Sequence, residues 1–486
     1  MGRKSVLAFF ILLFIATSCL HSQEDTDTRR KAANAIDSQR FAEALQILTP
    51  FLKTHPTDVS AWTLQGLALN GLGKTKESLL SFDHALVIDK AYLPALEAAS
   101  QTAYLHGDPS AMKYVKSLLA TSPDNEIANA MAGALAYQSH DCKSANEYFE
   151  HSQKAVYQSP TAISEFADCQ LKSEKKQEAL ATLSHGIQLH PHSGQLKYNL
   201  AIVQMQLHDF NGAIATLAPL SDAKDSELLN LLASAYAHAN RPDDAFSMLE
   251  KAIQIDPAKE SNYLDLAILC LDHSQENRAV TAASAGLVTI PRSASLYLIR
   301  GVAYAQLAQY DKAEHDFTAA TELEPNQPHS TIAMSLLYSD KNDPQKEKEL
   351  LEKQLRATPN DAVANYLLAD LLIRSGAMPG QAEYDKAQNH LAKSLEAKPD
   401  SAEAQVLMGK LLEQQHDFSG ALKHIQLALA IEPENRAALN REFILLRKLH
   451  RDQEANEALS RLRSLVNQEI QREVNIGQVR INSQSH

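Results

Sequence analysis

The 486-residue sequence is poor in glycine and lacks clustered positive charge. Only 16 residues are glycine, near half the usual share, which is expected of a chain that is almost entirely helical. No basic run occurs and the formal net charge is −13, so a nucleic-acid-binding surface is disfavoured. The negative charge is more simply explained by the solubility of a long exposed surface.

Motifs that carry chemistry are missing as well. The sequence contains no Gly-rich phosphate loop, no Gly-x-Ser-x-Gly elbow and no His-Glu-x-x-His pattern. The 19 histidines scatter through expected turns and helix ends. We therefore expect no metal site, no cofactor and no catalytic residues.

The sequence does contain a strict repeat. Pro257, Pro291, Pro325 and Pro359 stand at one constant interval along the chain. An alanine stands at one fixed distance before each of the first three prolines, and Glu347 stands at the same distance before the fourth. Further upstream, at a second fixed distance, a small residue precedes each of the four prolines. Self-similarity at a fixed period indicates a repeat architecture.

The unit from 294 to 325 shows what each repeat forms. Tyr297, Gly301 and Tyr304 recur with helical spacing on one stripe, and Phe317 lies on the stripe of a second helix. Pro325 ends the unit, because proline cannot continue a helix. Each unit is thus predicted to be two antiparallel helices, with small residues where their backbones approach closely.

This pattern resembles the tetratricopeptide repeat, whose consensus has an aromatic residue, Leu-Gly, Tyr, Ala, Phe and Pro within a period of about 34 residues. The matching residues of this unit are Tyr297, Gly301, Tyr304, Ala313, Phe317 and Pro325. Arg300 departs from the usual leucine. The resemblance implies an all-α, right-handed α-solenoid of about thirteen helix-turn-helix units between about residues 25 and 469, in which each unit stacks on its neighbours. Residues 470–486 are expected to be the end of a capping helix and a flexible tail.

One unit is longer than the others. The interval from Pro359 to Pro399 exceeds the interval between the earlier prolines, with the additional residues around 376–385. We expect a tolerated surface loop there, and a binding loop is the alternative. Because thirteen units leave no segment long enough for a catalytic domain, we expect that the protein is not an enzyme.

The cysteines do not indicate zinc binding or thioredoxin-like chemistry, because no pair has CxxC spacing. Cys270 occupies the repeat position of Tyr304, which is expected to face the core, and should behave as a small apolar residue. Cys142 begins a second helix and Cys169 lies within the next helix. A disulfide between these two would require an oxidising compartment, and we expect that it is absent.

Residues 1–22 resemble an export signal. Arg3 and Lys4 precede an unbroken apolar run from Val6 to Ala16, which is too short to span a bilayer as a mature helix but suits a signal peptide. The alternative, a buried amphipathic helix, is disfavoured because the run has no polar face.

Cys19 follows small residues, as in a bacterial lipobox, where the cysteine becomes the lipidated first residue. Ala16 departs from the leucine that such boxes usually carry. Lipidation of Cys19 and simple cleavage near Ser18 or Ser22 are therefore both open. We expect an exported protein of the periplasm or cell envelope; a cytoplasmic regulator with an uncleaved hydrophobic start is the weaker alternative.

In the resembled family, the first helices of successive units line a groove that contacts a peptide or a partner helix. The resemblance implies an apolar stretch of this groove between about residues 260 and 370. The residues predicted to line it are Leu264, Ile268, Leu298, Val302, Ile332, Leu336 and Tyr366. The alternative is that these side chains pack neighbouring first helices together. An earlier unit is more polar at the same places, with Ser164 and Asp168.

Some family members hold acidic tails of cytosolic chaperones with paired Lys and Asn residues, and this sequence has apolar residues at those places. We therefore expect a protein-interaction scaffold at the bacterial cell envelope, which binds other proteins and meets the membrane only through a lipid on Cys19. The alternative is a non-catalytic accessory subunit of an envelope enzyme, secretion or polysaccharide-export complex.

Overall fold

The computed structural model describes residues 24–325 and 327–483, with side chains described up to residue 468. Within these ranges no β-strand occurs. The helices follow one another in chain order as thirteen pairs, from a helix at 24–37 to the last helix, α26. The prediction of an all-α repeat protein with about thirteen units is confirmed. The predicted signal segment and Cys19 lie outside the described residues.

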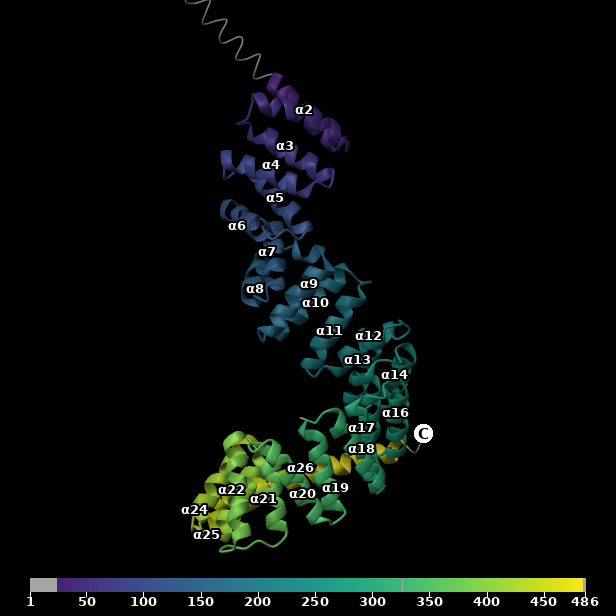
Figure 1. Cartoon of the computed structure of the whole chain (residues 1–486), viewed down its shortest axis with the longest axis vertical. Coiled ribbons are helices and arrows are strands. Elements are labelled where there is room, and N and C mark those ends of the chain that lie inside the picture. The colour runs from purple at the N-terminus through teal and green to yellow at the C-terminus, as the bar shows by residue number, and fades with distance from the viewer. Residues whose placement is uncertain (1–23, 326, 484–486) are drawn as a thin grey trace, which may run out of the picture. The chain divides into compact units, whose positions relative to one another are not determined.

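The described chain divides into two compact units, residues 24–245 and 246–483, with the division inside α14. The N-terminal unit contains, after the helix at 24–37, α2 (Phe41–Thr54), α3 (Val59–Gly71), α4 (Thr75–Ile88), α5 (Leu93–Leu105), α6 (Ala111–Thr121), α7 (Glu126–Gln138), α8 (Cys142–His151), η1 (Val156–Gln158), α9 (Pro160–Lys172), α10 (Lys176–Leu189), α11 (Gly194–Gln206), α12 (Phe210–Leu217), η2 (Ala218–Leu220), α13 (Ser226–His238) and the start of α14 (Pro242–Ile255). The C-terminal unit continues with α15 (Glu260–Asp272), α16 (Glu276–Thr289), α17 (Ala294–Gln306), α18 (Tyr310–Leu323), α19 (Pro328–Asp340), α20 (Pro344–Ala357), α21 (Ala362–Arg374), α22 (Ala382–Ala397), α23 (Ala402–Gln414), α24 (Phe418–Ile431), α25 (Arg436–Lys448) and α26 (Asp452–Ser483). Within each unit, consecutive helices lie beside one another (Figure 1).

Side-chain caps start many of the first helices. Asp58 accepts a hydrogen bond from the backbone N–H of Ala61 at 2.8 Å, and Ser293 accepts one from Leu296 at 2.9 Å. Such caps satisfy backbone donors that have no partner inside the helix. They explain why Asp, Asn and Ser recur just before the first helices.

The turns inside the units explain where several histidines lie. His140, His208, His416 and His450 follow the ends of first helices, with φ values of 60°, 59°, 65° and 56°. A residue in this left-handed conformation commonly terminates a helix. Histidine is among the non-glycine residues that are enriched there. These four histidines therefore have a structural role in the turns.

In several units a glycine on the first helix lies against a phenylalanine on the second. A Cβ atom on Gly66, Gly133 or Gly301 would lie 2.3, 2.6 or 2.5 Å from a ring carbon of Phe82, Phe149 or Phe317, respectively. Only a hydrogen fits at such a distance. Where the first-helix residue is alanine, as in Ala167, the partner at the equivalent place on the second helix is a smaller side chain, as in Leu183.

The long unit differs from a simple surface loop. Tyr384, within the expected insertion, is fully buried, and its hydroxyl donates to the carbonyl oxygen of Leu411 at 2.6 Å. Ala377 is also buried, whereas Met378 is 55% exposed. The additional residues thus contribute to the core and also leave an apolar side chain at the surface.

The last helix extends further than the sequence period suggested. Helix α26 continues to Ser483, through part of the segment expected to be a flexible tail. The residues from 468 to 483 contain no proline and several Gln, Glu and Arg residues, which are good helix formers. A helix can therefore continue there without the apolar periodicity that reveals a packed face.

Candidate functional site

The seven residues of the predicted apolar stripe fall into two groups. Ile268 on α15 and Leu336 on α19 are 46% and 54% exposed. The other five are partly buried and pack against core clusters: Leu264, Leu298, Val302, Ile332 and Tyr366. Some residues of the stripe are therefore exposed, and others pack against the core. That the stripe is a binding face stays a prediction.

Two residues that break the repeat pattern form buried ion pairs. Arg300 donates from Nε and Nη2 to the two carboxylate oxygens of Asp316, at 2.7 and 2.8 Å, and the Asp316 side chain is 2% exposed. These hydrogen bonds raise the pKa of Arg300. The pair joins α17 to α18 and explains how the unit accepts an arginine in place of the usual leucine.

Glu347, which breaks the alanine column, is paired in a similar way. Its Oε1 accepts from Arg374 on α21 at 2.9 Å and from the Ser335 hydroxyl at 3.1 Å. Its Oε2 has no hydrogen-bond partner among the described residues. Burial raises the pKa of Glu347, with a smaller contribution from Asp370, while Arg374 opposes the shift.

A larger hollow lies on the first-helix side of the N-terminal unit. A pocket of about 530 Å³ opens between α7, α9 and α11, whereas the pocket that Leu298 lines is only about 60 Å³. The residues that line the larger pocket are Tyr137, Thr161, Ser164, Glu165, Ala167, Asp168, Leu171, Leu183, Gln195, Asn199 and Ile202. We call this the α9 pocket.

The α9 pocket occupies the unit whose stripe positions, Ser164 and Asp168, are polar. Small residues on α9, such as Thr161 and Ser164, leave space between this helix and its neighbours. The sequence signal was therefore present, because small and polar residues at stripe positions indicate an open face. A search for apolar stripes alone does not find this pocket.

The charges around the α9 pocket are unevenly paired. Lys172 lies 2.7 Å from the Asp168 carboxylate and 5.5 Å from the centre of the Tyr137 ring. Burial, and then a hydrogen bond with Asp168, raise the pKa of Tyr137. Burial also raises the pKa of Glu165. Among the described residues, no hydrogen bond or ion pair holds the Glu165 carboxylate.

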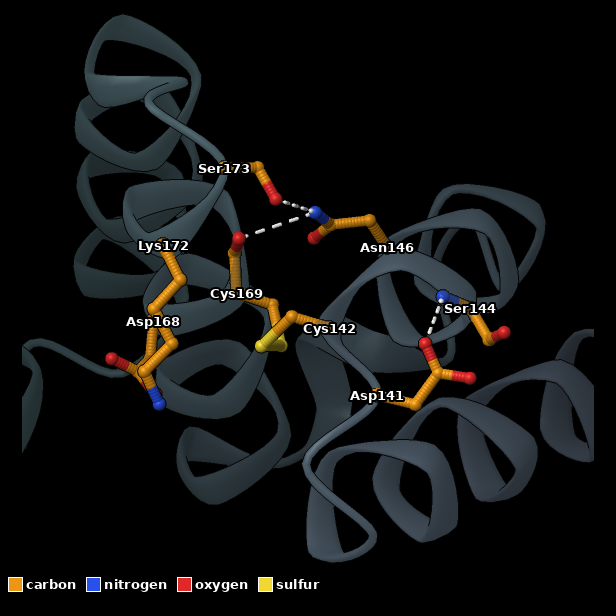
Figure 2. Close-up of a disulfide and its surroundings, with 8 residues drawn as sticks. All are labelled: Asp141, Cys142, Ser144, Asn146, Asp168, Cys169, Lys172 and Ser173. Carbon is orange, nitrogen blue, oxygen red and sulfur yellow. Dashed lines mark hydrogen bonds and ion pairs between the residues drawn. A yellow bond between two sulfur atoms is a disulfide. The ribbon is translucent and has the colours of Figure 1, made fainter.

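A disulfide next to this pocket corrects one expectation. Cys142 and Cys169 are bonded, with their Cα atoms 4.9 Å apart, so the bond joins α8 to α9 (Figure 2). Asn146 donates to the carbonyl oxygen of Cys169 at 3.2 Å and to the Ser173 hydroxyl at 3.1 Å. The spacing in sequence concealed the pairing, because the two positions become neighbours only when the helices stack.

In Figure 2, Asp168 projects from α9 on the side away from Asn146. The disulfide and the Asn146 hydrogen bonds thus fix α9 from its α8 side, while the pocket residues occupy another face of the same helix. Among the residues that the structure describes, the third cysteine, Cys270, is free and buried, and burial raises its pKa to about 11.

The described part of the chain holds no group of three or more His, Cys, Asp or Glu side chains placed to bind a metal ion. Within the same residues, no helix combines the length and the apolar character that crossing a bilayer requires.

Three family models, each described as tetratricopeptide repeat, match the chain. They cover residues 170–235, residues 226–259 and 294–327, and residues 30–92 and 380–436, which together make about half of the chain. The matched ranges occur in both compact units and include the α9 pocket's α11 wall.

A curated relative, anaphase-promoting complex subunit 3 of Schizosaccharomyces pombe, is 22% identical over 198 residues, which are 41% of this chain and 29% of that protein. The alignment thus spans less than a third of the relative's length. Among solved structures, yeast Tom70 has a TM-score of 0.45 at 15% identity, with 95% of this chain and 97% of that chain covered. A tetratricopeptide repeat protein from Parabacteroides merdae has a TM-score of 0.41 at 15% identity, with coverages of 60% and 99%.

Both the repeat period and the helix pairs continue between the matched ranges. The chain therefore belongs to the tetratricopeptide-repeat proteins.

Proposed function

We propose that this protein is a non-catalytic scaffold that binds segments of other proteins on its first-helix face. The observation that carries the proposal is the α9 pocket, which opens on the first helices of three successive repeats. A pocket of about 530 Å³ lies in the range of about 300–1,000 Å³ that is usual for ligand sites. The curated relative is, by its name, a subunit of a multiprotein complex, which is in keeping with this role.

We further propose that the protein is exported and acts at a bacterial cell envelope, with a lipid on Cys19 as its membrane anchor. Two observations support this location: the apolar run from Val6 to Ala16 and the Cys142–Cys169 disulfide. Structural disulfides persist in oxidising compartments and are rare in the cytosol. Cell fractionation with thiol trapping tests the location. A cytosolic protein with Met1 retained and both thiols free would refute it.

The exposed part of the stripe allows a test of whether the C-terminal unit also contributes to partner binding. Ile268→Glu with Leu336→Glu places two charges on exposed positions of first helices, so the melting temperature and helicity should stay unchanged while crosslinked partners are lost from native envelopes. Leu298→Glu is a poor test, because Leu298 packs against a core cluster and its replacement should destabilise the unit.

A matched control comes from the second helices. Val288 on α16 and Leu427 on α24 are 85% and 42% exposed, so Val288→Glu with Leu427→Glu makes the same charge change elsewhere on the C-terminal unit. We expect this control to keep its partners. If wild type, test variant and control capture partners equally, the stripe is not part of the binding face.

A further inference from the structure

We propose that the α9 pocket recognises a basic side chain, lysine or arginine, in an extended segment of a partner protein, with Glu165 as the carboxylate that pairs with it. This inference rests on the proposed scaffold function and adds the charge of the segment that is bound.

The space in the pocket suits a side chain with its adjoining backbone. Its lining includes the apolar side chains Leu171 and Ile202, which are partly exposed, and Thr161, which is exposed. These two apolar side chains can cover the methylene groups of a lysine or arginine stem, which commonly lie along apolar surface while the charged end finds a polar partner. On α11, Gln195 and Asn199 contribute amide groups, which can donate to and accept from a peptide backbone.

The pairing of charges singles out Glu165. Asp168 already has a cation, because Lys172 lies 2.7 Å away. Glu165 is half-buried and, within the described residues, has neither a hydrogen bond nor an ion pair to hold its carboxylate. A desolvated carboxylate without a partner is unfavourable, and an entering ammonium or guanidinium group would compensate it.

The charge of the pocket supports the same partner, because the charged side chains that line it, Glu165 and Asp168, are both acidic. The chain has a formal net charge of −13, which favours encounters with cationic segments. An acidic segment would instead meet the unpaired carboxylate of Glu165 with like charge. The pocket therefore differs in charge preference from a clamp built for carboxylate tails.

Selection from a random-peptide library on the full-length protein tests the inference. We expect peptides selected on wild type to carry lysine or arginine at one shared position, and this preference to be lost on Glu165→Gln. Glu147→Gln is the matched control, because Glu147 is exposed on α8, does not line the pocket and loses the same charge. Melting curves establish that the variants fold.

A synthetic peptide from the selected set then gives a quantitative test. Replacing its arginine by citrulline, or its lysine by norleucine, should weaken binding about tenfold on wild type and on Glu147→Gln, and by much less on Glu165→Gln. Thr161→Phe, which adds bulk at an exposed lining residue without changing charge, should weaken every selected peptide.

The outcomes separate the two proposals. Two results would overturn the basic-side-chain inference and leave the scaffold function standing. One is peptides that bind at this pocket without a basic residue. The other is that replacement by citrulline or norleucine weakens binding equally in wild type, Glu165→Gln and Glu147→Gln. Failure to select any peptide on the wild-type protein, together with failure to recover crosslinked partners, would overturn both.

Discussion

Replacement of Gly66 by alanine tests whether glycine–phenylalanine contacts set the distance between paired helices. A Cβ atom at Gly66 would lie 2.3, 2.6 and 2.8 Å from three ring carbons of Phe82, which is fully buried. The ring must therefore shift by roughly 1 Å to restore an ordinary contact near 3.5 Å. Such overpacking costs about 1–3 kcal/mol. Alanine in place of a mid-helix glycine recovers about 1 kcal/mol, so we expect a net loss of up to about 2 kcal/mol.

The compensating change is visible in the same protein. Ala167 and Leu183 occupy the corresponding positions of another unit, so Phe82→Leu should make room for the new methyl group. We expect Gly66→Ala with Phe82→Leu to be more stable than the sum of the single effects predicts, by at least about 1 kcal/mol, because contacting residues are coupled.

Chemical denaturation followed by the fluorescence of Trp62, the single tryptophan, measures this in the N-terminal unit. Gly194→Ala is the control, because a Cβ atom there meets nothing within 4 Å, and this variant should be neutral or slightly stabilised. Single effects of Gly66→Ala and Phe82→Leu that simply add, within about 0.5 kcal/mol, would refute the proposed contact.

Two further predictions concern the disulfide and a buried acid. Reduction of the Cys142–Cys169 bond, which closes a separation of 27 residues, should lower the free energy of unfolding of the N-terminal unit by about 3 kcal/mol. Denaturation with and without reductant measures this, and a Cys169→Ser variant that still responds to reductant would contradict it. The raised pKa of Glu347 means that its protonated form contributes stability below the ordinary pKa of 4.5, and that this contribution is lost as the pH rises through the raised pKa. The free energy of unfolding of wild type minus that of Glu347→Gln should therefore be larger at about pH 4 than at about pH 7, with the exposed Glu349→Gln as control; a difference that grows with pH would contradict the shift.

Much of the architecture could be predicted because the repeat signal is local. The spacing of Tyr297, Gly301 and Phe317 depends only on helical periodicity and on the size of side chains at helix crossings. Proline at a fixed interval marks where each pair of helices ends. The count of about thirteen units followed from the sequence for this reason.

The candidate site was less predictable, because its properties arise between helices. Residues on one helical stripe, such as Leu298 and Leu336, differ in burial according to the neighbouring unit. The α9 pocket likewise depends on residues of four helices, α7, α9, α10 and α11. A pattern confined to one helix cannot indicate how much space remains between that helix and its neighbours.

The amino-acid sequence by itself determined the class of fold, the length of the repeat and the places where small residues are required, since these follow from backbone geometry within one unit. Tertiary structure alone decided that Cys142 meets Cys169, that Arg300 and Asp316 form a buried pair, and that Glu165 faces a pocket without a partner charge. The physical reason is that bonding, desolvation and charge pairing depend on which surfaces the stacked helices bring together.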